Sequence, residues 1–144
     1  MKIFDCITFY HENFITNIRF EILNEYVDYF VVCESKFSHI GEPKNLNFKL
    51  LNEKFKKKII YIKHETQFPK LNSPWKNQAI QRDHILKNLD LADSNDYILF
   101  SDPDEIPNPN ILKNLFLKKK FGIFFQKSYC YKFNLYNKFE TPWE

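Results

Sequence analysis

The sequence predicts an α/β fold built on a mostly parallel central sheet. Segments typical of strands alternate with segments typical of helices, and this order produces strand–helix–strand units with right-handed crossovers. Two short, continuous apolar runs, residues 29–33 and 97–100, are typical of strands that are buried on both faces of such a sheet. The chain has 144 residues and no repeat or low-complexity linker, so we expect a single domain over residues 1–144.

The first half of the chain begins with an apolar run at residues 3–8 that predicts the first strand. An amphipathic helix is expected next, because apolar side chains recur at helical spacing. The members of this apolar stripe are Phe14, Ile15, Ile18, Ile22 and Leu23. After the strand at 29–33, the expected elements are a loop (35–44), a short helix (48–55), a third strand (59–62) and a second loop (64–74).

The second half contains the clearest helix, residues 75–89. Its apolar stripe consists of Trp75, Ala79, Leu86 and Leu89. The fourth strand follows, and after it Asn108 is a suitable N-cap with Pro109 as the first helical residue, so a helix is predicted to run to about Lys119. Residues 121–135 are aromatic and partly alternating, which predicts strands again.

The composition excludes several kinds of binding site. A net charge of +3 is too small to predict a nucleic-acid partner. The lysine clusters at 54–58 and 118–120 are interpreted as solvated faces, with a weak attraction to phosphates or an anionic membrane surface as the alternative. Gly41 and Gly122 are the only glycines, so neither a G-x-G-x-x-G motif nor a Walker loop can be formed.

The cysteines indicate a reducing compartment. Cys6, Cys33 and Cys130 each lie in an apolar, strand-like run, and no spacing of Cys or His suggests zinc. Buried, reduced thiols in a cytoplasmic protein are the expected explanation. The sequence has no signal peptide and no transmembrane segment, which also favours the cytoplasm. An aromatic share of 18% leaves surface for self-association as a homo-oligomer.

The sharpest chemical feature follows the fourth strand. Asp102, Asp104 and Glu105 place three carboxylates within four positions, where like charges repel unless a cation compensates them. A hard divalent ion, Mn²⁺ or Mg²⁺, would suit these oxygen ligands and would neutralise charge on a departing diphosphate. The alternative is a solvated acidic turn ahead of a helix.

Arg82 is the second feature, because it points along the otherwise apolar stripe of the helix at 75–89. A guanidinium there needs either a carboxylate partner or an anion that binds in a cleft, and the same two alternatives hold for Arg19. The histidines form no spaced ligand pair, and we expect surface or loop roles for them. They are His11, His39, His64 and His84.

Several sequence blocks, in order along nearly the whole chain, resemble glycosyltransferase family 17, the family typified by β-1,4-mannosyl-glycoprotein β-1,4-N-acetylglucosaminyltransferase. Each block is unspecific alone, but their combination is specific. The blocks are residues 5–12 with Arg19; residues 27–34 followed by His39, Gly41, Pro43 and Lys44; Trp75 with residues 81–83; residues 101–107 with Pro109; and residues 133–135 with Pro142 and Trp143.

This resemblance implies a GT-A-like (Rossmann-like) three-layer sandwich that binds a UDP-sugar and transfers the sugar, by analogy N-acetylglucosamine, to a glycan acceptor with inversion. It implies that Asp102 and Asp104 hold Mn²⁺ or Mg²⁺. It further implies that Asp102 contacts the donor together with Glu34, Arg82 and Asp83. Gln78 departs from the resemblance, because an acidic residue is expected at that position.

The sequence alone does not identify the catalytic residue. An inverting displacement needs a carboxylate base near the acceptor hydroxyl. Glu140 and Glu144 are the only acidic residues after Glu105, and neither lies in a recognisable motif. The sequence therefore looks truncated at its C-terminus, and a non-catalytic or partner-dependent UDP-sugar-binding fragment is one alternative. A phosphatase of the haloacid-dehalogenase type is another, although Ile106 stands where that class normally has Thr or Val.

Overall fold

The computed structural model describes residues 1–70, 73–127, 129, 135 and 136. The chain divides into two compact units, residues 1–106 and residues 107–144. The first unit contains a four-stranded sheet, and the second contains one short helix among its described residues. The expectation of a single domain over residues 1–144 stays a prediction.

The sheet of the first unit is entirely parallel, as the sequence predicted. Its strands lie in the order β3-β2-β1-β4. Their bounds are β1 (Ile3–Phe9), β2 (Tyr29–Ser35), β3 (Ile59–His64) and β4 (Tyr97–Ser101). All four strands were predicted to within two residues, because each is a short apolar run between polar segments. The burial expected for residues 97–100 on both faces is wrong: β4 lies at the edge of the sheet, and Ile98 and Phe100 are 38% and 39% exposed.

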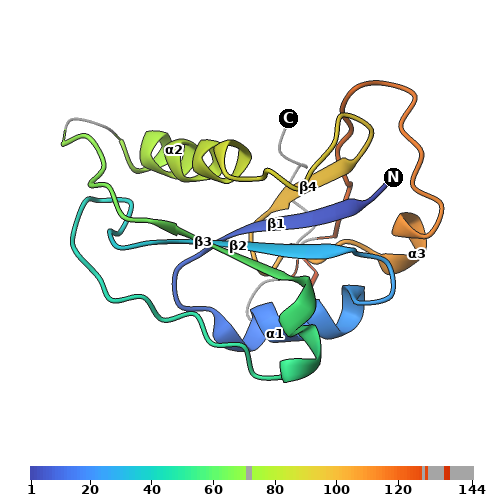
Figure 1. Ribbon diagram of the computed structural model, residues 1–144, viewed down its shortest axis with the longest axis horizontal. Helices are drawn as coiled ribbons and strands as arrows, with labels where there is room; N and C mark the ends of the chain where they lie inside the picture. The colour runs from blue at the N-terminus through green and yellow to red at the C-terminus, as the bar shows by residue number, and fades with distance from the viewer. Residues whose placement is uncertain (71–72, 128, 130–134, 137–144) are drawn as a thin grey trace. The chain divides into compact units, whose positions relative to one another are not determined.

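Two helices cover opposite faces of this sheet, α1 (Asn13–Leu23) on one and α2 (Pro74–Lys87) on the other (Figure 1). Phe4, Cys6, Val31 and Ile62 form a core cluster with Ile85 of α2. The α1 side has an aromatic core instead. Its rings belong to Phe20, Phe30, Phe48 and Phe55. The result is an α/β fold with helices on both faces of a parallel sheet, as expected.

The buried face of α1 differs from the predicted stripe. Phe14 is 76% exposed and Ile22 is also exposed, whereas Thr16, Asn17 and Arg19 are buried with Phe20 and Leu23. Hydrogen bonds explain this difference. The Asn17 side chain bonds to the backbone of residues 49 and 51, and the Arg19 side chain bonds to Asp5 of β1. These contacts orient the helix more strongly than the apolar stripe does.

The stripe predicted for α2 is also wrong, except at Leu89, which lies just beyond the helix and is buried in the core cluster. Trp75 is 74% exposed and Leu86 is exposed, and the buried residues of the helix are Asn77, Gln81 and Ile85. Asn77 and Gln81 turn toward the sheet because their side-chain amides donate to the backbone oxygens of residues 39 and 33. A polar row therefore faces the strand ends.

Two smaller elements are shorter or later than predicted. The helix expected at 48–55 is a 3-10 helix, η1 (Glu53–Lys58), because the backbone N–H groups of residues 48, 49 and 51 donate to side chains of Glu34, Asn13 and Asn17 instead of forming a helix. The helix expected to reach Lys119 is α3 (Pro109–Leu112), capped by Asn108 as predicted.

The strands predicted at 121–135 are absent from the described part of that range, where residue 129 forms only an isolated bridge with residue 136. Residues 128 and 130–134 lie outside the described residues, as do Cys130, Glu140, Pro142, Trp143 and Glu144. Within the described ranges, no helix is long and apolar enough to cross a membrane.

Candidate functional site

The carboxyl ends of the four parallel strands meet along one edge of the sheet, where ligands bind in open α/β folds. Tyr10 follows β1, Ser35 ends β2, His64 ends β3 and Asp102 follows β4. The polar row of α2 lies beside these ends, since Gln81 donates to the carbonyl oxygen of residue 33 at 2.7 Å. The parallel sheet thus brings residues from all four strand exits to one edge.

The turn after β4 is closed by its own residues. The Asp102 N–H donates to Glu105 Oε2 at 2.9 Å, and the Glu105 N–H donates back to the Asp102 carbonyl oxygen at 3.0 Å. Ser101 Oγ donates to the Glu105 carbonyl oxygen at 3.2 Å, and Pro103 is buried. The Glu105 carboxylate therefore caps the turn, and the carboxylates of Asp102 and Asp104 are left for other partners.

Arg19 holds this turn from the α1 side of the sheet. It is completely buried, and its Nε and Nη2 form a two-pronged ion pair with Asp5 at 2.7 Å each. Nη2 also donates to Ser101 Oγ at 2.6 Å, and Nη1 donates to the carbonyl oxygens of Asp102 (2.9 Å) and Glu105 (3.1 Å). Of the two roles the sequence left open for Arg19, the structure shows the internal pairing.

Arg82 reaches the same turn from α2. Its Nη2 lies 3.0 Å from Asp102 Oδ1, and the two side chains are 43% and 42% exposed. Gln78 Nε2 makes a long contact of 3.5 Å with the same oxygen. Arg82 thus has the carboxylate partner that was one of its two alternatives. Asp83, the next residue, is exposed on α2, and its side chain makes no polar contact among the described residues.

The acidic turn suits a hard cation that keeps open positions. Asp104 is exposed, and its carboxylate contacts no donor among the described residues. In the described part of the chain, no group of three or more His, Cys, Asp or Glu residues is placed to hold a metal ion by itself. A cation held by Asp102 and Asp104 would complete its shell with water and phosphate oxygens, which is how Mg²⁺ is usually bound.

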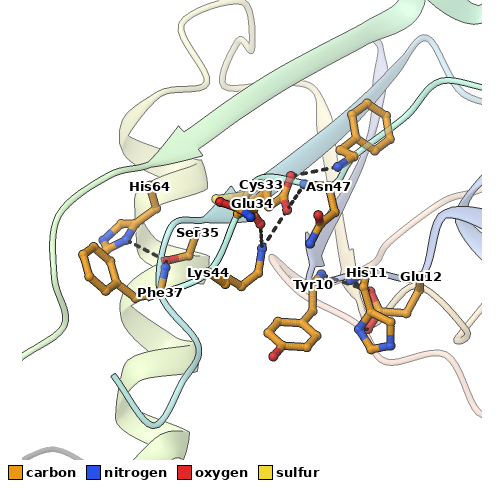
Figure 2. Close-up of polar contacts among 12 residues, drawn as sticks. Tyr10, His11, Glu12, Cys33, Glu34, Ser35, Phe37, Lys44, Asn47 and His64 are labelled. Carbon is orange, nitrogen blue, oxygen red and sulfur yellow. Dashed lines mark hydrogen bonds and ion pairs between the residues drawn. The ribbon is translucent and has the colours of Figure 1, made fainter. Parts of the chain in front are cut away.

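Glu34 lies at the end of β2 and is fully buried (Figure 2). Its carboxylate accepts hydrogen bonds from Lys44 Nζ and the Asn47 N–H at 2.7 Å each, from Tyr61 Oη at 2.7 Å and from the Phe48 N–H at 3.0 Å. Burial raises the pKa of Glu34, but these hydrogen bonds outweigh it and hold the pKa below its ordinary value. Glu34 therefore fixes the segment from 44 to 48, and its contact with a donor stays a prediction.

An aromatic ring stands beside Glu34 at the exit of β1. Tyr10 is 46% exposed, and Lys44 Nζ lies 5.2 Å from the centroid of its ring. The Glu12 carboxylate accepts from the N–H groups of Tyr10 and His11 at 3.0 Å, which fixes the backbone of this exit (Figure 2). The sequence marked the strand exit around Tyr10 as a place where a ligand could bind and included Lys44 in the family resemblance, but it assigned a specific role to neither residue.

The end of β3 carries a histidine whose expected surface or loop role is wrong, because His64 is buried. It stacks on Phe68 with ring centroids 4.7 Å apart, meets His84 edge-on at 4.9 Å and lies 3.4 Å from Ser35 Oγ through Nδ1. Burial, with a smaller contribution from His84, lowers the pKa of His64. His39 is anchored separately, by a 2.8 Å bond between its Nε2 and Gln81 Oε1.

Two of the cysteines are buried free thiols, as predicted. Burial raises the pKa of Cys33 to about 12 and also raises the pKa of Cys6. Neither thiol can act as a nucleophile near neutral pH, because the thiolate is the reactive form. Both belong to the core between the sheet and α2.

The sequence of this chain matches one family of known proteins. The sequence profile of glycosyltransferase family 17 matches residues 1–143. The β-1,4-mannosyl-glycoprotein 4-β-N-acetylglucosaminyltransferases of Rattus norvegicus and Homo sapiens are each 38% identical to this chain over 69 residues, which are 46% of this chain and 12% of the relative. The Mus musculus enzyme is 36% identical over the same length. The matched region thus spans about an eighth of those relatives. No solved structure matches the chain.

Proposed function

This chain belongs to glycosyltransferase family 17, and on that premise we propose that it binds a UDP-sugar with a divalent metal ion and transfers the sugar to a glycan acceptor with inversion. N-Acetylglucosamine is the donor sugar that the names of the relatives favour. The observation that carries the proposal is the turn after β4, where two carboxylates and one half-exposed guanidinium stand at the carboxyl edge of a parallel sheet.

The residues of the turn have separate roles in this proposal. Asp102 and Asp104 would hold Mn²⁺ or Mg²⁺, which when bound neutralises the negative charge that a departing nucleoside diphosphate gains. Arg82 is close enough to this turn to donate to a phosphate oxygen, and a planar guanidinium suits that geometry. Arg19 donates to the Asp102 carbonyl oxygen, so the backbone of the turn is already fixed before substrate binds.

The exit of β1 and the segment fixed by Glu34 would form the other wall of the donor site. Tyr10 offers an exposed aromatic face, and Lys44 is directed toward it by its bond to Glu34. Glu34 would then contribute to donor binding chiefly through the groups it holds. No residue is assigned as the general base, because Glu140 and Glu144 lie outside the described residues.

The test is donor binding and turnover on the same protein. Calorimetry with UDP and Mn²⁺ should show clearly weaker binding to Asp104→Ala than to wild type, and equal affinity would remove the metal assignment. Release of UDP from UDP-N-acetylglucosamine, with and without a panel of glycan acceptors, should then show turnover. Binding without any turnover would instead support a partner-dependent or non-catalytic donor-binding fragment. Mg²⁺-dependent hydrolysis of a generic phosphate ester would favour a phosphatase.

A further inference from the structure

Two arginines reach the turn after β4, and they are held very differently. Arg19 is buried, and its guanidinium donates to five acceptor atoms. Among the described residues, Arg82 makes a single ion-pair contact, from Nη2 to Asp102 Oδ1 at 3.0 Å, and its side chain is 43% exposed. The first contact set fixes the backbone of Asp102, whereas the second leaves the guanidinium free to exchange partners.

We propose that Arg82 and the divalent cation are antagonists at the Asp102 carboxylate, so that Arg82 weakens metal binding until a nucleoside diphosphate arrives. This inference rests on the proposed function, because it takes Asp102 as a metal ligand. Without nucleotide, the guanidinium occupies Oδ1 and places a positive charge beside the site. With nucleotide, Arg82 transfers to the diphosphate and leaves the carboxylate to the cation.

The exposure of the pair makes this exchange possible. An ion pair that is nearly half exposed is screened by water, and such pairs change an equilibrium by about fivefold at most. The contact is also one-pronged, because a single guanidinium nitrogen pairs with a single carboxylate oxygen, whereas Arg19 and Asp5 form two bonds. Release of Arg82 therefore disturbs little else in the fold.

The surroundings of the pair keep Arg82 within reach after release. Gln81, its neighbour on α2, is buried and bonded to the carbonyl oxygen of Cys33, so this part of the helix is pinned to the sheet. Asp102 is pinned by Arg19 and by Glu105. The backbones of Arg82 and Asp102 thus stay in place, and only the Arg82 side chain has to turn.

The consequence is positive coupling between metal and nucleotide. A diphosphate removes the competing guanidinium from Asp102, so UDP should raise the affinity for Mn²⁺, and Mn²⁺ should raise the affinity for UDP by the same factor. Part of such coupling arises from direct contact between a cation and a diphosphate. A substitution of Arg82 isolates the remaining part of the coupling, which depends on this side chain.

The experiment measures Mn²⁺ affinity with and without saturating UDP, by calorimetry and by the electron paramagnetic resonance signal of free Mn²⁺. Wild type is compared with Arg82→Gln, Arg82→Lys and the control Lys87→Gln, which removes one positive charge from an exposed position of the same helix. Arg82→Gln should bind Mn²⁺ alone about two- to fivefold more tightly than wild type. It should also bind UDP in the presence of Mn²⁺ about tenfold more weakly.

Arg82→Lys keeps the charge without the planar fork, so its Mn²⁺ affinity without UDP should stay near that of wild type. Lys87→Gln should match wild type in both measurements. Unchanged or weaker binding of Mn²⁺ to Arg82→Gln, or an equal gain in Lys87→Gln, would overturn the antagonism. Failure of wild type to bind Mn²⁺ even with UDP would instead defeat the proposed function itself, so the two failures are distinguishable.

Discussion

Replacement of Arg19 by methionine tests the internal ion pair that supports the site. The substitution removes a guanidinium that is fully buried and that bonds to both carboxylate oxygens of Asp5. It also removes the donors to Ser101 Oγ and to the carbonyl oxygens of Asp102 and Glu105. Methionine is unbranched and flexible, so it fills much of the vacated volume and the lost interactions are mainly electrostatic.

The size of the expected loss in the free energy of unfolding follows from the Asp5 carboxylate that remains after the substitution. Asp5 is only 1% exposed, so without Arg19 its charge is buried and unpaired. Breaking a buried pair by removing one partner costs about 3–5 kcal/mol, because the remaining charge has lost its compensation. That is a large part of the 5–15 kcal/mol by which domains are typically stable, and we expect Arg19→Met to lower the free energy of unfolding by about 3–5 kcal/mol.

The assay is urea unfolding followed by far-ultraviolet circular dichroism at neutral pH. The double variant Arg19→Met/Asp5→Leu removes both charges and should recover most of the loss, because replacing a whole buried pair by apolar residues is often neutral. Wild type, the two single variants Arg19→Met and Asp5→Leu, and the double variant form a double-mutant cycle that gives the interaction energy between the two side chains. Lys57→Met, the same kind of change at an exposed position, is the control and should match wild type.

Two results would refute the reasoning. A loss below about 1 kcal/mol in Arg19→Met would place this arginine among ordinary surface pairs. A double variant that is less stable than either single variant would mean that the ion pair between Arg19 and Asp5 is not the main contribution of these side chains to the free energy of unfolding.

Three further predictions concern other parts of the sheet edge and core. Glu34→Gln should destabilise the fold by about 1–3 kcal/mol and speed hydrogen exchange of the Asn47 and Phe48 amides, since their carboxylate acceptor is weakened. Burial and the nearby His84 lower the pKa of His64 from an ordinary value of 6.5, so the unfolded state binds more protons; the free energy of unfolding should fall as pH drops below about 6.5, and His64→Gln should flatten that dependence. In a Cys130→Ser variant, Cys6 and Cys33 should react with a thiol reagent at neutral pH only after unfolding, because burial disfavours both thiolates.

The strands could be predicted from the sequence because each is a short apolar run between polar segments. The runs could not distinguish the central strands β1 and β2, which are buried on both faces, from the edge strand β4, where Ile98 and Phe100 are exposed. The helix faces could not be predicted. The apolar stripe of α1 points outward at Phe14, and the face that packs carries Arg19 and Asn17. Helical periodicity identifies an amphipathic helix, but it cannot reveal that a buried polar face has found partners far along the chain.

The same distinction explains the outcome for the site. Asp102 and Asp104 could be put forward as metal ligands because a strand exit is local information, and that assignment stays a prediction. The choice between an anion and a carboxylate as partner of Arg82 depended on a contact across 20 positions in sequence, and the four partners of Glu34 lie 10 to 27 positions away. Contacts between residues so far apart in sequence depend on the strand order β3-β2-β1-β4, and this order cannot be read from any one segment of the sequence.

The central claim is that the carboxylates after β4 hold a divalent cation together with a nucleoside diphosphate. The most direct measurement is a titration of Mn²⁺ into the protein with saturating UDP, in which the resonance signal of free Mn²⁺ is followed for wild type and for the isosteric variant Asp104→Asn. We expect wild type to remove Mn²⁺ from solution up to a single ion per chain and Asp104→Asn to do so far more weakly. Equal uptake by both proteins would contradict it.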